Sequence, residues 1–157
     1  MQLQRILCPV DFSECSLRAA DYAFELAKRF RAGVEIVHVW QPVIPGGEIR
    51  GPMSAYVGEE AEIGRALERI RPRSIDVSCQ HHLLVGDPVE EIVEIAEEHQ
   101  VDLIVIGTHG RTGLSRWIVG SVAENVLRRA TCPVLTVKHL HLKEPAYCVE
   151  SKISFAT

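Results

Sequence analysis

The sequence predicts an α/β protein in which a single doubly wound, five-stranded parallel sheet carries helices on both faces. Two observations support this fold class. Short apolar, β-branched runs recur along the 157 residues and are typical of strands buried on both faces. Between them lie longer segments whose apolar residues repeat every three or four positions, as on one face of a helix. Such alternation favours a parallel sheet with right-handed crossovers.

The first strand is expected at residues 5–10, followed by a helix. Asp11 or Ser13 is the candidate N-cap, and Asp11 has an acidic residue three positions on, which is capping-box spacing. The helix is expected to end at Gly33, and the second strand covers 34–40. The predicted inward face of the helix is Ala20, Ala23, Phe24, Ala27 and Phe30.

The middle of the chain is predicted to contain another helix, another strand and the start of a third helix. Residues 41–54 are rich in proline and glycine and are expected to form a lid-like connection. A helix is expected at 55–71 and a strand at 76–85, before Asp87 as N-cap and Pro88 as first helical residue. The residues predicted to face inward are Ile63, Ala66, Leu67 and Ile70 in the former helix and Val89, Ile92, Val93 and Ala96 in the latter.

Residues 101–130 are the most informative stretch. A buried strand at 103–106 leads into a glycine-rich loop, and a helix follows from Ser121, its expected N-cap. A last strand is expected at 133–138. The predicted buried face of that last helix is Val122, Ala123, Val126, Leu127 and Ala130.

The loop predicts an anion site. A helix start offers free N–H groups and a positive dipole end, and glycine allows the backbone to approach a ligand closely. The loop is neither a P-loop nor a G-x-G-x-x-G motif. Its pattern is Gly107-x-x-Gly110, nine residues, then Gly120-Ser121.

That spacing resembles the ATP-binding signature of the universal stress protein family. Four further segments match the family in order and spacing. They are ILCPVDFSE near the N-terminus, VHVW at 37–40, VGDPVEEIVEIAEE from residue 85 and CPVLTVK from residue 132. The resemblance covers residues 1–138 as a nucleotide-binding domain and leaves 139–157 as a C-terminal tail of unassigned role. It implies a Rossmann-like fold with strand order 3-2-1-4-5.

The resemblance also implies a nucleotide site at the crevice where the strand order reverses. Asp11 would bind a ribose hydroxyl or help to hold Mg²⁺, Pro9 and Val10 would line the base pocket, and the Val39 backbone would contact the adenine edge. The loop would hold the phosphates, with Arg111 as a candidate source of positive charge. The complete expected set is Pro9, Val10, Asp11, Val39, Ile106, Gly107, Gly110, Arg111, Gly120, Ser121 and Val122.

The function that follows is an ATP-binding sensor or switch of the stress response, with ATP and Mg²⁺ as cofactors. The loop lacks lysine, and no paired carboxylates or base for activating water are evident, so at most slow ATP hydrolysis is expected. One alternative is a dimeric stress-response scaffold that does not bind nucleotide. Another, a phospho-acceptor receiver domain, is disfavoured because Asp11 has no acidic neighbour.

Composition limits the kinds of binding partner that are expected. A formal net charge of -4 gives no reason to expect nucleic acid or an anionic membrane. Neither a signal peptide nor a membrane-length apolar stretch is evident, which favours the cytoplasm. The apolar fifth strand would be a sheet edge, so a homodimer paired along it is expected.

Cysteines and histidines outside the loop carry no predicted site. The five cysteines form an odd set without a C-x-x-C pair, so no disulfide framework is expected. Cys15 lies near a helix start, which would lower its pKa if exposed. His81 and His82 point to opposite faces of a strand and lack the clustered partners of a zinc site in the sequence.

Overall fold

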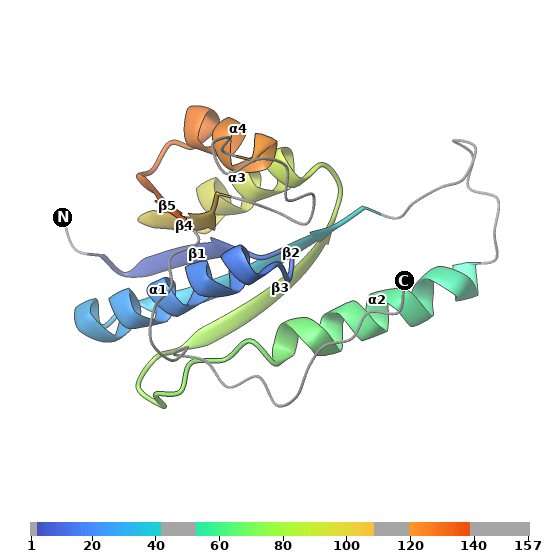
Figure 1. Ribbon diagram of the computed structural model, residues 1–157, viewed down its shortest axis with the longest axis horizontal. Coiled ribbons are helices and arrows are strands. Elements are labelled where there is room, and N and C mark those ends of the chain that lie inside the picture. Colours follow the sequence, from blue (N-terminus) through green and yellow to red (C-terminus); the bar gives the residue numbers. More distant parts are fainter. Residues whose placement is uncertain (1–2, 42–52, 109–119, 139–157) are drawn as a thin grey trace.

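The structure is a computed structural model that describes residues 3–41, 53–108 and 120–138, without the side chains of 53–57. Its elements alternate along the chain (Figure 1). The strands are β1 (Arg5–Pro9), β2 (Gly33–Trp40), β3 (Cys79–Val85), β4 (Leu103–Gly107) and β5 (Val134–Val137). The helices are α1 (Glu14–Phe30), α2 (Met53–Glu68), α3 (Pro88–Glu98) and α4 (Ser121–Arg129). This confirms the predicted succession.

The strands form one parallel five-stranded sheet in the order β3-β2-β1-β4-β5. The predicted doubly wound sheet and its 3-2-1-4-5 order are therefore confirmed. The order reverses between β1 and β4, so the chain leaves these neighbouring strands in opposite directions. A crevice opens at this point in doubly wound sheets.

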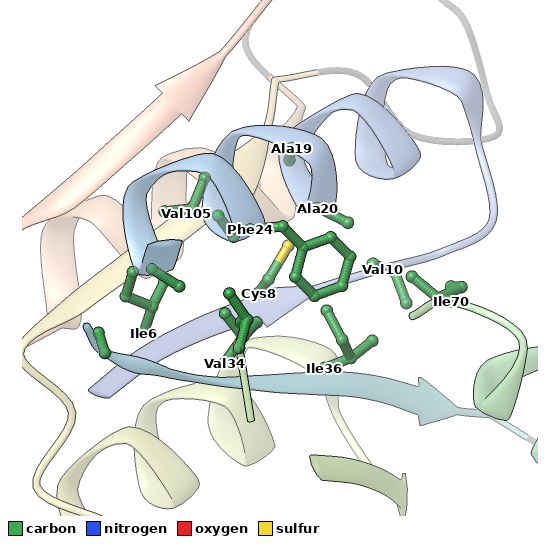
Figure 2. Packing of buried hydrophobic residues seen from close by; sticks show 14 of the residues in the cluster. Ile6, Cys8, Val10, Ala19, Ala20, Phe24, Val34, Ile36, Ile70 and Val105 are labelled. Atoms are coloured by element: carbon green, nitrogen blue, oxygen red, sulfur yellow. The ribbon is translucent and has the colours of Figure 1, made fainter. Parts of the chain in front are cut away.

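Two hydrophobic layers cover the sheet, one on each face. On one face, α1 and the end of α2 pack against alternate residues of β1 and β2, and Figure 2 shows Phe24 among Cys8, Val10 and Ile36. On the other face, α3 and α4 pack against Leu7, Val37 and Ile104. Because successive strand residues point to opposite faces, both layers draw on the same strands. In the described residues, no helix is both long and apolar enough to cross a membrane.

The structure decides between the two candidate N-caps of α1 and corrects the predicted end of this helix. Ser13 is the N-cap, since its side chain accepts a hydrogen bond from the Ser16 N–H. Gly33 does not end that helix: Arg31 takes the left-handed conformation (φ 57°) and Gly33 begins β2. A Cβ on Gly33 would lie 2.9 Å from Ser78 Oγ, so a larger residue here would require the Ser78 side chain to shift.

Two residues predicted to lie in the core, and the predicted start of the third strand, also differ from the structure. Phe30 is 56% exposed because it is the last residue of α1, and Leu127 is 51% exposed because α4 buries only a narrow stripe around Ala123 and Val126. β3 starts at Cys79 rather than at 76. The preceding residues form a turn in which Ser74 hydrogen-bonds with Asp76, which competes with strand pairing.

Candidate functional site

A cavity of about 370 Å³ lies where β1, β2 and β4 end, within the size range of small-ligand sites. α3 and α4 both begin at its wall. The structure brings nine of the eleven residues expected at a site together around it, and Gly110 and Arg111 lie outside the described residues. The nine are Pro9, Val10, Asp11, Val39, Ile106, Gly107, Gly120, Ser121 and Val122.

The other residues that line the cavity were not in the expected set of site residues. They come from the carboxyl end of β2 and from α1, α3 and α4, which begin at the crevice. Topology was the only available signal, because any residue at these element ends faces the crevice once the strand order is known. These further lining residues are Ser16, Val37, His38, Gln41, Pro88, Ile92 and Ala123.

Asp11 is held in place by the first turn of α1. Its Oδ1 accepts hydrogen bonds from the Ser13 N–H (3.1 Å) and the Ser13 hydroxyl (2.5 Å). Its own N–H donates to Ser16 Oγ (3.2 Å). Because Ser13 holds its carboxylate and Ser16 its backbone N–H, half-buried Asp11 has a defined position at the cavity wall.

His38 is a buried polar residue of β2 at this end of the sheet. Its Nδ1 lies 2.7 Å from the Val10 carbonyl oxygen, and since a carbonyl only accepts, Nδ1 must carry the proton. The ring packs against Phe12 in a tilted arrangement, with centroids 4.7 Å apart and an interplanar angle of 46°. Phe12 has φ 63°, an uncommon backbone conformation for a bulky residue, and the contact with the imidazole helps to stabilise it. His38 therefore fixes the turn that presents Asp11.

Gly107 is required by packing against α1. A Cβ at this position would lie 3.0 Å from the carbonyl carbon and oxygen of Cys15 and from the Ser16 nitrogen. These are backbone atoms, which cannot move aside as a flexible side chain would. The last residue of β4 is thus a glycine because the start of α1 crosses it, and this contact holds Asp11 and β4 at the same crevice.

The start of α4 is open to the cavity. Gly120 is the N-cap, and no side chain supplies a capping hydrogen bond. Ser121 is the first helical residue, so its prediction as the N-cap was wrong. The first N–H groups of an α-helix have no partner within the helix, and in α4 these belong to Ser121, Val122 and Ala123, which all line the cavity. With the positive end of the helix dipole, they form a place for an anion.

Thiol chemistry does not contribute to this site. Cys8, Cys15, Cys79 and Cys132 are free cysteines, while Cys148 lies outside the described residues. Cys15 is buried and its thiol donates to the Val137 carbonyl (3.2 Å). Burial raises the pKa of the Cys8 thiol far above its ordinary value. These thiols behave as small core side chains.

Comparisons with known proteins agree with this architecture. A family model described as the universal stress protein family matches residues 2–138. A universal stress protein of Methanocaldococcus jannaschii is 38% identical over 144 residues, which cover 86% of this chain and 82% of that protein. The chain belongs to the universal stress protein family.

Solved structures of the family resemble it closely. The universal stress protein UspA from Lactobacillus plantarum superposes with a TM-score of 0.74 at 25% identity, covering 87% of this chain and 99% of the other. A universal stress protein from Archaeoglobus fulgidus in complex with dAMP gives a TM-score of 0.60 at 30% identity, covering 88% and 100%.

Proposed function

We propose that this member of the universal stress protein family binds ATP, with Mg²⁺, in the crevice and acts as a nucleotide-dependent sensor or switch in the stress response. The observation that supports this most directly is the uncapped start of α4 at the crevice wall. An anion is the natural partner of such a helix end. The dAMP complex of the Archaeoglobus relative supports an adenine nucleotide as the ligand class.

The residues around the cavity suggest a division of roles. The backbone of Gly120, Ser121 and Val122 would hold the phosphates, together with the loop residues Gly110 and Arg111. The lining residues Pro9, Val10, Val39 and Ile106 are apolar and would contact the base. Gly107 would support the turn between these two parts.

Asp11 fits the part of the nucleotide between base and phosphates. Its carboxylate is oriented by Ser13 at the cavity wall. A carboxylate there can accept a hydrogen bond from a ribose hydroxyl, and carboxylate oxygens are also the ligands that Mg²⁺ prefers. Bound Mg²⁺ would supply charge neutralisation for the phosphates.

The crevice is better suited to binding than to rapid hydrolysis. Among the described lining residues, Asp11 is the only carboxylate and His38 the only imidazole, and both take part in the hydrogen bonds that shape the β1–α1 turn. Fast phosphoryl transfer needs a positioned base and concentrated positive charge at the phosphates. We therefore propose that ATP turnover is at most slow.

Calorimetric titration of nucleotide-stripped protein with ATP and Mg²⁺ tests the proposal. We expect micromolar binding, about 8 kcal/mol, and its loss in Gly120→Val. Gly120 has φ -55° and ψ 144°, which valine can adopt, so this variant should fold while its side chain crowds the helix start. Gly58→Val in α2 is the matched control, since a Cβ there meets nothing within 4 Å.

A complete lack of nucleotide binding would contradict the proposal. If ATP, AMP and cyclic AMP all give neither heat nor a thermal shift with the folded wild-type protein, nucleotide binding is wrong. The dimeric scaffold without nucleotide would then be the function to pursue.

We also propose that two copies pair along β5. This strand is an edge of the sheet, and Leu135 on it is 39% exposed. An exposed apolar edge strand favours pairing with a second chain. Light scattering after size exclusion should give twice the chain mass for the wild type and a single chain for Leu135→Lys. A monomeric wild type at micromolar concentration would contradict the pairing.

A further inference from the structure

We propose that Glu35, His82 and His99 form a binding site for a divalent transition-metal ion, Zn²⁺ in the first place, on the α3 side of the sheet. Their candidate ligand atoms all lie within 4.8 Å of one another. The site is separate from the nucleotide crevice. It lies where α3 ends, whereas the crevice lies where α3 begins.

Three elements far apart in the sequence bring these side chains together. Glu35 is in β2 and His82 in β3, where His82 pairs with Val37, two residues beyond Glu35 on the same face of the sheet. His99 is the C-cap of α3. The prediction that His82 lacks clustered partners was therefore wrong, because the partners come from other elements.

The carboxylate of Glu35 is the unusual member of this cluster. The residue is 8% exposed, and its Oε2 lies 2.5 Å from His99 Nδ1 and 3.0 Å from His82 Nε2. Within the described residues, no arginine or lysine lies within ion-pair distance of it. The contact with His99 Nδ1 is a hydrogen bond, which partly compensates the buried carboxylate. A metal ion held by the carboxylate and the two imidazoles would take the place of this bond and supply full positive charge.

His82 points to the same conclusion independently. Its Nε2 is buried and has no hydrogen-bond partner among the described residues, although it lies close to Glu35 Oε2. The distance is short enough for a hydrogen bond, so the angle must be unfavourable. The ring nitrogen therefore carries an unmet polar requirement, which a metal bond to its lone pair would satisfy.

The surroundings favour a cation. His99 ends α3, and the negative end of the helix dipole attracts positive charge. The last turn of α3 contains no basic residue, and Glu97 and Glu98 lie in it. The Arg5 guanidinium donates to the His99 carbonyl oxygen, which fixes the backbone of this ligand but also places one positive charge nearby.

The ligand types select the metal. Two imidazole nitrogens and one carboxylate oxygen suit Zn²⁺ and its transition-metal neighbours better than Mg²⁺ or Ca²⁺. Ligand atoms around tetrahedral zinc lie roughly 3.3 Å apart for bonds of about 2.0–2.1 Å. Glu35 Oε2 lies somewhat closer than this to the two imidazole nitrogens, at 2.5 and 3.0 Å, so small side-chain shifts would be needed to admit the ion. Three protein ligands leave the fourth position to water.

A competing pair lies on the other face of β3. His81 Nε2 is 3.7 Å from Cys79 Sγ but also 2.9 Å from the Ile70 carbonyl oxygen, a hydrogen bond that already satisfies it. Burial raises the pKa of the Cys79 thiol to about 11, which disfavours the thiolate that a metal needs. His81 is therefore the matched control for His82.

The experiment is a Zn²⁺ titration of the metal-stripped full chain against a chromophoric chelator, without nucleotide, followed by thermal denaturation. We expect one equivalent bound and a raised Tm. His82→Gln and His99→Gln should each weaken binding by at least about 10-fold and remove the Tm increase, whereas His81→Gln should retain both. The cobalt form should show tetrahedral d–d bands without a sulfur-to-metal charge-transfer band.

Three results would overturn the site. They are a wild type that binds no stoichiometric Zn²⁺, wild-type affinity in both His82→Gln and His99→Gln, and a thiolate band that disappears in His81→Gln. The wild-type titration needs no variant to fold. It is also independent of ATP binding, so failure here leaves the crevice proposal untouched.

Discussion

α3 and α4 begin at the same crevice, but only α3 has a side-chain cap on the N–H groups of its first turn. Asp87 caps α3, and its Oδ1 accepts from the N–H groups of Val89 (2.9 Å) and Glu90 (3.2 Å). Pro88, the first helical residue, has no N–H to satisfy. α4 instead has Gly120 as N-cap and no capping side chain. One helix start is completed by the side chain of its N-cap, and the other has no side-chain cap.

The two helix starts therefore differ in what they favour: a side-chain cap favours helix stability, and an uncapped start favours anion binding. A side-chain cap stabilises a helix by about 1 kcal/mol but occupies the groups that would bind an anion. α4 forgoes that stabilisation at the wall of the cavity. α3 begins beside the same cavity, yet its carboxylate cap and the acidic Glu90 and Glu91 make its start unsuitable for a phosphate. The following substitutions exchange features between the two helix starts.

The largest effect is expected from Gly120→Asp, which gives α4 the cap of α3. The carboxylate would occupy the N–H groups and repel phosphates, so ATP affinity should fall at least about 100-fold. Helix stability should rise by a few tenths of a kcal/mol because aspartate is the better N-cap. Calorimetry and thermal denaturation measure the two effects. Unchanged ATP affinity in this variant would place the phosphates elsewhere.

A smaller loss is expected from Ser121→Pro, which copies the first residue of α3. Proline is favoured at this helical position, and Gly120 already has the extended backbone that precedes proline. The variant removes one N–H from the proposed phosphate site, which should weaken ATP binding about 10-fold. Ser121→Ala keeps the N–H and is the control. Equal losses in both would assign the effect to the hydroxyl group.

The smallest effect is expected from Asp87→Ala, and it should appear in stability alone. Losing this cap should cost about 1 kcal/mol, or roughly 2–4 °C in Tm for a chain of this size. ATP affinity should stay within about twofold because Asp87 does not line the cavity. Asp87→Asn, which keeps an accepting oxygen, should recover most of the stability. A large loss of affinity would show that α3 also contributes to binding.

The features that the sequence predicted correctly are those that depend on residues close together in the chain. Hydrophobic periodicity identified all nine elements, because burial on one face or both imposes its own spacing on each element. The cap at Asp87-Pro88 was also correct, since capping geometry spans only three or four residues. The glycine pattern and the position of Asp11 pointed to the crevice, and nine of the eleven expected residues line its cavity. The nucleotide contacts of all eleven remain predictions.

Local patterns failed where a distant segment decides the outcome. Gly33 was predicted to end a helix, but it begins β2 and lies beside Ser78, which is remote in the chain. The close contact of Gly107 with the backbone of α1 also joins distant segments and was not predicted, whereas its predicted ligand contact stays a prediction. The exposure of Leu127 likewise depends on how much of α4 the sheet edge covers.

The sequence by itself thus determined the alternating elements and the family, because these follow from residue spacing along single segments. Only the tertiary structure brought Glu35, His82 and His99 within ligand distance, through the register of β2 on β3 and the point where α3 ends. Register and helix placement are set by packing across the whole sheet. No single segment of the chain contains that information.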